Sequence, residues 1–224
     1  MKCFVLNGWA ASERAWDLCK FGRDRIFSYI EQLDGLAEKE LAACEGAVLV
    51  GWSMGGSTAL RLALDHPGKI RGLVLVAATP RMMEERESGW KGMSMRRLEA
   101  LRRGVELTHG EGFFGTPEGR PNPYMADCDE NLRRGLKYLY ETDLRDRLTA
   151  VAPLDIPAAI FQAERDGIVR ASNAEFLAGL FSGRELVTVP GAEHALPVEI
   201  PGLIDEAVAK IKAEISEFDI ISAK

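Results

Sequence analysis

Short apolar runs bounded by glycine, proline or polar residues constrain the fold of this chain most strongly. Five are clear and RIFSY (25–29) is a weaker sixth; the five are CFVLN (3–7), AVLVG (47–51), GLVLVA (72–77), AAIFQA (158–163) and ELVTV (185–189). Runs in which consecutive residues are apolar, without the alternation of apolar and polar residues, are typical of strands buried on both faces of a parallel sheet. The pattern therefore predicts a mainly parallel sheet of about six strands.

Helical patterns lie between these runs. Apolar periodicity predicts helices at 33–44, 55–65, 172–181 and 202–217. Strands that alternate with helices form right-handed βαβ units, which build a doubly wound sheet with helices on both faces. The sequence thus predicts an α/β fold.

The interval at 81–150 breaks this alternation. Its apolar residues recur at helical spacing in two stretches and predict at least two amphipathic helices; the positions are 95, 98, 101, 105, 132, 136, 139, 140, 144 and 148. The glycine-rich and proline-rich residues between the stretches predict a long loop, which in a compact protein is usually a lid, a binding loop or disorder. We predict a core of residues 1–80 and 151–224 with a helical lid inserted at 81–150.

Charge and cysteine content exclude several classes of protein. The formal net charge of the 224 residues is −6, which disfavours a nucleic-acid binder, and no apolar run is long enough to span a membrane. The four cysteines, at 3, 19, 44 and 128, show neither close pairing nor zinc-like spacing with the histidines at 66, 109 and 194. We expect reduced thiols, a cytoplasmic protein and no metal or cofactor.

The motif GWSMG, at 51–55, carries the strongest functional signal. Ser53 lies between a predicted buried strand and a predicted helix, which is the context of a nucleophile elbow. Gly51 and Gly55 suit a turn too tight for side chains, and Gly56 would let the helix pack close to the sheet. The alternative is a serine that only caps the helix, and the context favours the nucleophile.

A nucleophilic serine needs a base, and His194 is the histidine placed to supply one. It follows the predicted strand at 185–189, at the carboxyl edge of the sheet. His66 ends the helix that follows Ser53, where a capping role is expected, and His109 falls in the predicted lid. We predict that His194 takes the proton of Ser53.

The base needs an acid that holds its tautomer, and Asp166 is the best candidate. It follows the predicted strand at 158–163 and gives the order serine, acid, histidine that an elbow fold requires. Glu164 is a nearby competitor, whereas Asp155 precedes the strand and lies at the wrong end of the sheet. We expect the Asp166 carboxylate to reach Nδ1 of His194.

Two backbone N–H groups must hold the oxyanion, and aromatic residues would line a pocket beside it. The residue after the nucleophile supplies one donor, Met54 N–H, and the loop after the first strand supplies the other, for which Trp9 N–H is best placed. Candidate pocket residues are Trp9, Trp52, Phe113 and Phe114.

With these residues in place the sequence resembles the α/β-hydrolase superfamily over nearly its whole length. The matching segments are NGW, GWSMGG, ALDHPGKIRGLVLVAATP, ERDGIV and GAEH. Within the superfamily the chain is most similar to the BioH-type carboxylesterases of biotin synthesis, which cleave pimeloyl-[acyl-carrier protein] methyl ester. The GWS elbow, a tryptophan in the oxyanion loop and a lid of this size suggest that family. The resemblance implies a serine carboxylesterase with a Ser-His-Asp triad and no cofactor.

The sequence departs from that family at two points. Asn7-Gly8 replaces the usual His-Gly before the oxyanion tryptophan, which changes the side chain that supports the loop. The chain also starts at the oxyanion strand, so two strands that ordinarily precede it are missing. Both departures leave the catalytic groups in place.

The distribution of charge in the predicted lid indicates which kind of partner protein could bind there. Residues 81–150 hold 13 lysines and arginines and 13 aspartates and glutamates, and the basic ones cluster as Arg96, Arg97, Arg102, Arg103, Arg133, Arg134 and Lys137. Such clusters would steer an acidic acyl-carrier protein, but they are equally expected on a solvated helix face. Two other functions stay open on the same fold: a lyase of menaquinone synthesis and a carrier-binding protein without catalysis.

Overall fold

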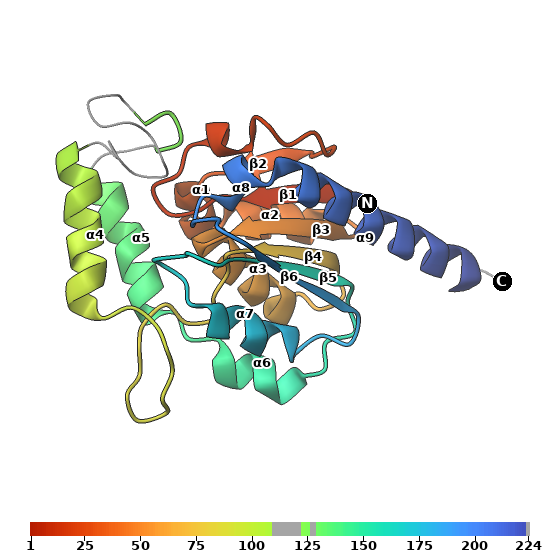
Figure 1. Ribbon diagram of the computed structural model, residues 1–224. Helices are drawn as coiled ribbons and strands as arrows, with labels where there is room; N and C mark the ends of the chain where they lie inside the picture. The colour runs from red at the N-terminus through yellow and green to blue at the C-terminus, as the bar shows by residue number, and fades with distance from the viewer. Residues whose placement is uncertain (109–121, 126–128, 223–224) are drawn as a thin grey trace.

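The computed structural model describes residues 1–108, 122–125 and 129–222 and contains a six-stranded parallel sheet (Figure 1). The strands are β1 (Lys2–Leu6), β2 (Arg25–Phe27), β3 (Ala47–Trp52), β4 (Ile70–Val76), β5 (Ala158–Ala163) and β6 (Arg184–Val189). They lie in the order β2-β1-β3-β4-β5-β6, and every adjacent pair is parallel. The predicted α/β class and strand number are confirmed.

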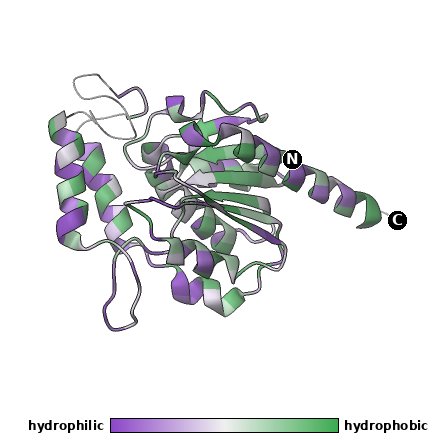
Figure 2. Cartoon of the chain, viewed as in Figure 1, coloured by the Kyte–Doolittle hydropathy of each residue, from purple (hydrophilic) through white to green (hydrophobic). Residues whose placement is uncertain are grey.

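The position of a strand in the sheet decides its burial. Every residue of β3 and β5 is buried, as their continuous apolar runs predict. The expectation that the run at 185–189 is buried on both faces is wrong, because β6 is an edge strand whose residues are exposed or half-buried. Figure 2 shows the contrast between the mainly hydrophobic strands and the mixed surfaces of the outer helices.

Helices cover both faces of the sheet because side chains alternate along each strand. Phe4 and Leu6 face the layer that contains α2 (Leu36–Ala43), α3 (Met54–Asp65), α6 (Arg145–Val151) and α7 (Ala171–Ala178). Cys3 and Val5 face the layer that contains η1 (Glu13–Trp16), α8 (Leu196–Glu199) and α9 (Pro201–Ser222). The predicted helix at 33–44 corresponds to α2, and a further short helix, α1 (Tyr29–Leu33), precedes it; the chain turns between the two at Gly35, which has φ +77°.

Residues between β4 and β5 add two helices beside the carboxyl ends of the strands (Figure 1). These are α4 (Met95–Thr108) and α5 (Asp129–Glu141), which bury Leu98, Val105, Leu132 and Leu139 against Trp9, Tyr29 and Met54. Helix α6 instead packs Leu148 into the core beneath the sheet. The division into a core and a lid of residues 81–150 stays a prediction. No helix in the described part of the chain has the length and apolar character to cross a membrane.

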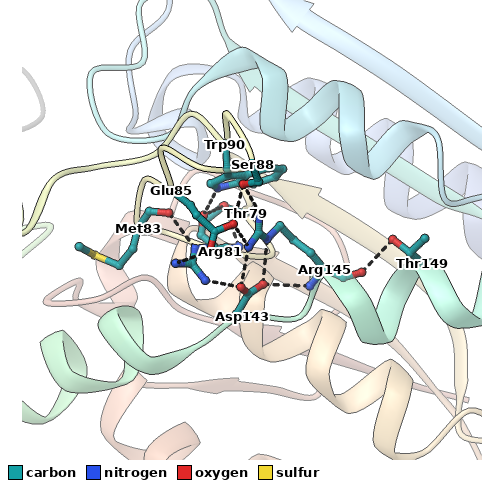
Figure 3. Close-up of polar contacts among 9 residues, drawn as sticks. All are labelled: Thr79, Arg81, Met83, Glu85, Ser88, Trp90, Asp143, Arg145 and Thr149. Atoms are coloured by element: carbon teal, nitrogen blue, oxygen red, sulfur yellow. Dashed lines mark hydrogen bonds and ion pairs between the residues drawn. The ribbon is translucent and has the colours of Figure 1, made fainter.

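A polar network ties the residues that follow β4 to the start of α6 (Figure 3). Arg81 forms an ion pair with Asp143, and Nη2 of Arg145 lies 2.8 Å from Asp143 and 2.9 Å from Glu85. The Arg145 guanidinium also lies 5.1 Å from the ring centroid of Trp90. The network holds residues 81–90 against the chain that leads back into the sheet.

The Asp143 carboxylate gives this network a pH dependence. Partial burial raises its pKa, but hydrogen bonds from Arg145 and Arg81 outweigh burial and lower the pKa from 3.8 to about 2. Because the folded-state pKa lies below the ordinary value, the stabilisation is complete at neutral pH and is lost as the pH falls from about 4 through about 2.

We expect Asp143→Asn to lower the free energy of unfolding by about 1 to 2 kcal/mol at pH 7, with the difference from wild type shrinking toward pH 2. Urea unfolding across this pH range measures it. Asp146→Asn, at an exposed position in the first turn of α6, is the matched control. A pH-independent difference would contradict this interpretation.

Candidate active site

Ser53 lies at the sharp turn between β3 and α3. Its backbone has φ +55° and ψ −116°, a conformation that costs a non-glycine residue about 1 to 3 kcal/mol. Its side chain makes no capping hydrogen bond to α3, although it occupies the N-cap position. The strained turn therefore holds the hydroxyl away from the helix, and the capping interpretation does not describe it.

Two glycines let this turn pack against its neighbours. A Cβ added to Gly55 would lie 2.0 Å from the carbonyl oxygen of Leu6, and one added to Gly56 would lie 2.3 Å from Cβ of Ala78. The start of α3 thus touches the end of β1 and the residues after β4. This contact places Ser53 beside the loop that follows β1.

A chain of hydrogen bonds joins Ser53 to His194 and Asp166. Nε2 of His194 lies 3.0 Å from Oγ of Ser53, and Nδ1 lies 2.8 Å from Oδ2 of Asp166. An ionised carboxylate only accepts hydrogen bonds, so Nδ1–H donates to Asp166 and Nε2 accepts from the serine hydroxyl. The structure brings together the three side chains that the sequence singled out, each from a loop at the carboxyl edge of the sheet.

Asp166 is fixed as an anion. Burial raises the pKa of this carboxyl, but the charge and hydrogen bond of His194 and the N–H groups of Ile168 and Val169 outweigh burial and lower it. Those N–H groups donate to Oδ1 at 2.8 and 2.9 Å, which leaves Oδ2 for His194. The side chain is 1% exposed, so water does not compete for these bonds.

Trp52 holds His194 in place through a hydrogen bond and a contact between their rings. The Trp52 indole Nε1–H donates to the backbone carbonyl of His194 at 2.9 Å, and the two ring centroids are 5.9 Å apart. The other candidates lie elsewhere: His66 contacts Glu38 at 3.2 Å, and Glu164 accepts the N–H of Gly191. His109 is outside the described residues.

The loop after β1 brings backbone N–H groups to Ser53. A Cβ added to Gly8 would lie 3.5 Å from Cβ of Ser53, so the two backbones are neighbours. Within the described part of the chain, no hydrogen bond uses the N–H of Trp9 or of Met54. Both proposed oxyanion donors are therefore free to bind an oxygen.

Asn7 supports this loop from the protein interior. Its Oδ1 accepts the N–H of Gly8 at 3.0 Å and the indole N–H of Trp16 at 3.1 Å, and its Nδ2 donates to the carbonyl of Ala11 at 2.9 Å. The side chain is fully buried. Asn7, which stands where histidine is usual, thus makes hydrogen bonds to both ends of the loop.

A small apolar cavity adjoins Ser53. Its volume is about 30 Å³, enough for a water molecule or two and too little for an acyl chain. Ser53, His194, Gly8, Trp9 and Trp52 line it together with the apolar residues Met82, Leu98, Leu101, Val105, Met125, Leu139 and Ile168. Phe113 and Phe114 lie outside the described residues. The apolar lining residues were not predicted from the sequence. The helical periodicity of α4 and α5 did predict that Leu98, Leu101, Val105 and Leu139 lie on the apolar faces of these helices.

Most of the arginines considered for carrier docking have acidic partners. Arg102 is buried and forms ion pairs with Glu99 and Glu106, so its guanidinium is not exposed for a docking partner to contact. The carboxylates of Glu99, Glu106 and Asp34 also pair, respectively, with Arg103, Arg133 and Arg134. Arg97 donates to the carbonyl of Gly167 at 2.7 Å, and the exposed Arg96 has no carboxylate partner among the described residues.

Comparison with known sequences finds esterases among the relatives of this chain. The chain is 27% identical to the pimeloyl-[acyl-carrier protein] methyl ester esterase of Yersinia enterocolitica, over 91% of this chain and 90% of the relative. It is 30% identical to the protein of the same name in Xanthomonas oryzae pv. oryzae, over 78% of this chain and 74% of the relative. The resemblance that the sequence motifs suggested is confirmed.

Solved structures share the fold. An esterase from Exiguobacterium antarcticum superposes with a TM-score of 0.70 at 18% identity, over 95% of this chain and 92% of that one. A bromoperoxidase from Bacillus anthracis gives a TM-score of 0.69 at 18% identity, with the same coverage. The model of the alpha/beta hydrolase family matches residues 8–206. The chain belongs to the alpha/beta hydrolase family.

Proposed function

We propose that this protein is a serine carboxylesterase that hydrolyses an acyl ester. The observation that carries the proposal is the hydrogen-bonded chain from Ser53 through His194 to Asp166, next to two free backbone N–H groups. A serine, a base and an orienting acid with an oxyanion hole are the parts that acyl transfer requires.

The mechanism follows from these positions. Oγ of Ser53 attacks the ester carbonyl carbon while its proton moves to Nε2 of His194, and the N–H groups of Trp9 and Met54 stabilise the oxyanion. His194 then gives the proton to the leaving alkoxide, and an acyl-enzyme forms on Ser53. Water gives a proton to His194 and attacks the acyl carbonyl, and His194 returns that proton to Oγ of Ser53 as the acid is released. Asp166 holds the required tautomer and stabilises the imidazolium.

The apolar cavity and the relatives' names together indicate the substrate. The cavity residues other than Ser53 and His194 are glycine, tryptophan, methionine or aliphatic residues, and this apolar lining suits an acyl chain. The relatives are named as esterases of pimeloyl-[acyl-carrier protein] methyl ester. We extend that substrate to this protein, and with it a role in biotin biosynthesis in the cytoplasm.

Docking of an acidic carrier protein would depend on a few arginines. Arg96 and Arg97 are exposed and lack carboxylate partners in the described structure, whereas the charges of Arg103, Arg133 and Arg134 are already offset. Arg97 also contacts the loop that carries Asp166. The docking proposal therefore centres on the start of α4.

Ser53→Ala or His194→Ala should lower kcat for a short p-nitrophenyl ester by about 10⁴ to 10⁶, because each removes a group that transfers the proton or forms the acyl-enzyme. Asp166→Asn should cost about 10³ to 10⁴. His66→Ala and Asp155→Asn, which alter the same residue types away from the site, are the matched controls.

Near-wild-type hydrolysis by Ser53→Ala would contradict the mechanism. A fluorophosphonate adduct on Ser53 without any ester turnover would favour the lyase instead. Binding of an acyl-carrier protein with neither adduct nor turnover would favour a protein that only binds the carrier.

Arg96→Glu should lower kcat/KM for pimeloyl-[acyl-carrier protein] methyl ester by about twofold to tenfold, because rim charges act mainly on association. Hydrolysis of the free methyl ester should not change. Lys210→Glu, with the same charge change on α9, is the control. Equal losses on the free and the carrier-bound ester would contradict docking at Arg96.

Asn7→Asp should lower kcat about tenfold with KM within about twofold of wild type. The new carboxylate still accepts from Gly8 and Trp16 but turns an oxygen toward the carbonyl of Ala11, which displaces the oxyanion loop. Steady-state kinetics with thermal unfolding test this. A raised KM at unchanged kcat would show that Asn7 acts on substrate binding instead.

A further inference from the structure

Gly135 lies in the interior of α5, where glycine is unfavourable. Relative to alanine it costs a helix about 0.5 to 1 kcal/mol, so its presence calls for a packing reason. A Cβ at this position would lie 2.3 Å from Cδ1 and 2.8 Å from Nε1 of the Trp9 indole. The missing side chain is what lets α5 rest directly on Trp9.

A hydrogen bond fixes the same contact. The Trp9 indole N–H donates to the backbone carbonyl of Leu132 at 3.0 Å, and both groups are buried. Leu132 precedes Gly135 by three residues, so the two contacts lie on one face of α5. Together they set the plane and the position of the indole.

The rest of the oxyanion loop is also bound to the segment that precedes α5. Ser12 donates its backbone N–H to the carbonyl of Tyr124 at 2.8 Å and its hydroxyl to the carbonyl of Pro123 at 2.7 Å. Between these anchors Ala10 has φ +60°, a strained conformation for a residue other than glycine. A displaced indole therefore moves the loop backbone, which includes the Trp9 N–H.

We propose that Gly135 is a positioning residue for the oxyanion hole, and that α5 sets the place of the Trp9 N–H through it. The inference rests on the proposed esterase function. Helices α4 and α5 line the cavity beside Ser53, so an acyl chain that displaces α5 displaces Trp9 as well. Contacts between the acyl chain and these helices are thus expressed in kcat, through stabilisation of the oxyanion.

The first test is Gly135→Ala, measured with a short p-nitrophenyl ester. The added methyl displaces the indole, and we expect kcat to fall about tenfold to a hundredfold with KM within about twofold, since removal of a whole oxyanion donor costs about 10² to 10³. Gly202→Ala, at a helical glycine with open space around it, should leave both constants unchanged.

The second test separates this effect from a general loss of structure. Trp9→Ala removes the ring but keeps the backbone N–H, and Gly135→Ala added to it should cost less than about twofold further. The double variant also has room for the methyl if Gly135→Ala alone folds poorly. Trp9→Phe, which removes the indole donor to Leu132 together with the five-membered ring that contacts Gly135, should lower kcat severalfold.

A readout independent of turnover is the indole N–H resonance of Trp9, assigned by its loss in Trp9→Phe. It should shift in Gly135→Ala and stay in place in Gly202→Ala. An unshifted resonance, an unchanged kcat, or a full further loss in the Trp9→Ala background would each overturn the proposal. Absence of ester turnover in the wild type would instead contradict the proposed function, with the resonance still testing the contact.

Discussion

The contact between the start of α3 and the end of β1 is the constraint on which the site depends. Only a residue without a side chain fits where the backbone of Gly55 meets the Leu6 carbonyl. This approach brings the nucleophile turn to the loop after β1, so Ser53 and the Trp9 N–H belong to one site. The hydrogen bonds of Asn7 then fix the loop on its inner side. Without the close approach of Gly55 to Leu6, the hydrogen bonds of Asn7 would not place the Trp9 N–H beside Ser53.

Local pattern and chain order predicted the parts of this site that depend on the strands. The apolar runs located the six strands, and a parallel sheet gathers their carboxyl ends at one edge, so residues just after β3, β5 and β6 had to meet. That reasoning led to Ser53, Asp166 and His194. The burial of β6 could not be predicted in the same way, because composition does not reveal which strand lies at an edge.

Contacts across the chain explain what sequence reasoning missed. Trp9 and Gly135 are far apart in sequence, and the only local sign of their contact is a glycine inside an amphipathic helix. The arginines of α4 and α5 looked like a basic surface because their partners lie in α4 and, for Arg134, in the turn after α1, far away in the sequence. Ion pairs with Glu99, Glu106 and Asp34 offset much of that charge. The arginines without a carboxylate partner in the described structure, Arg96 and Arg97, lie at the start of α4.

The two halves of the catalytic machinery are therefore anchored differently. Ser53, Asp166 and His194 follow β3, β5 and β6, and hydrogen bonds from Trp52 to His194 and from Ile168 and Val169 to Asp166 hold the base and the acid in place. The loop that carries the Trp9 backbone N–H is instead held by Asn7 on its inner side and, through the Trp9 indole, by α5 on its outer side. In the proposed mechanism, proton transfer thus depends on residues that follow the strands of the sheet, whereas oxyanion stabilisation depends on the helices that line the cavity. On that proposal the enzyme would discriminate among acyl groups in the transition state, since an acyl chain that fits against α5 would also keep the Trp9 N–H in place.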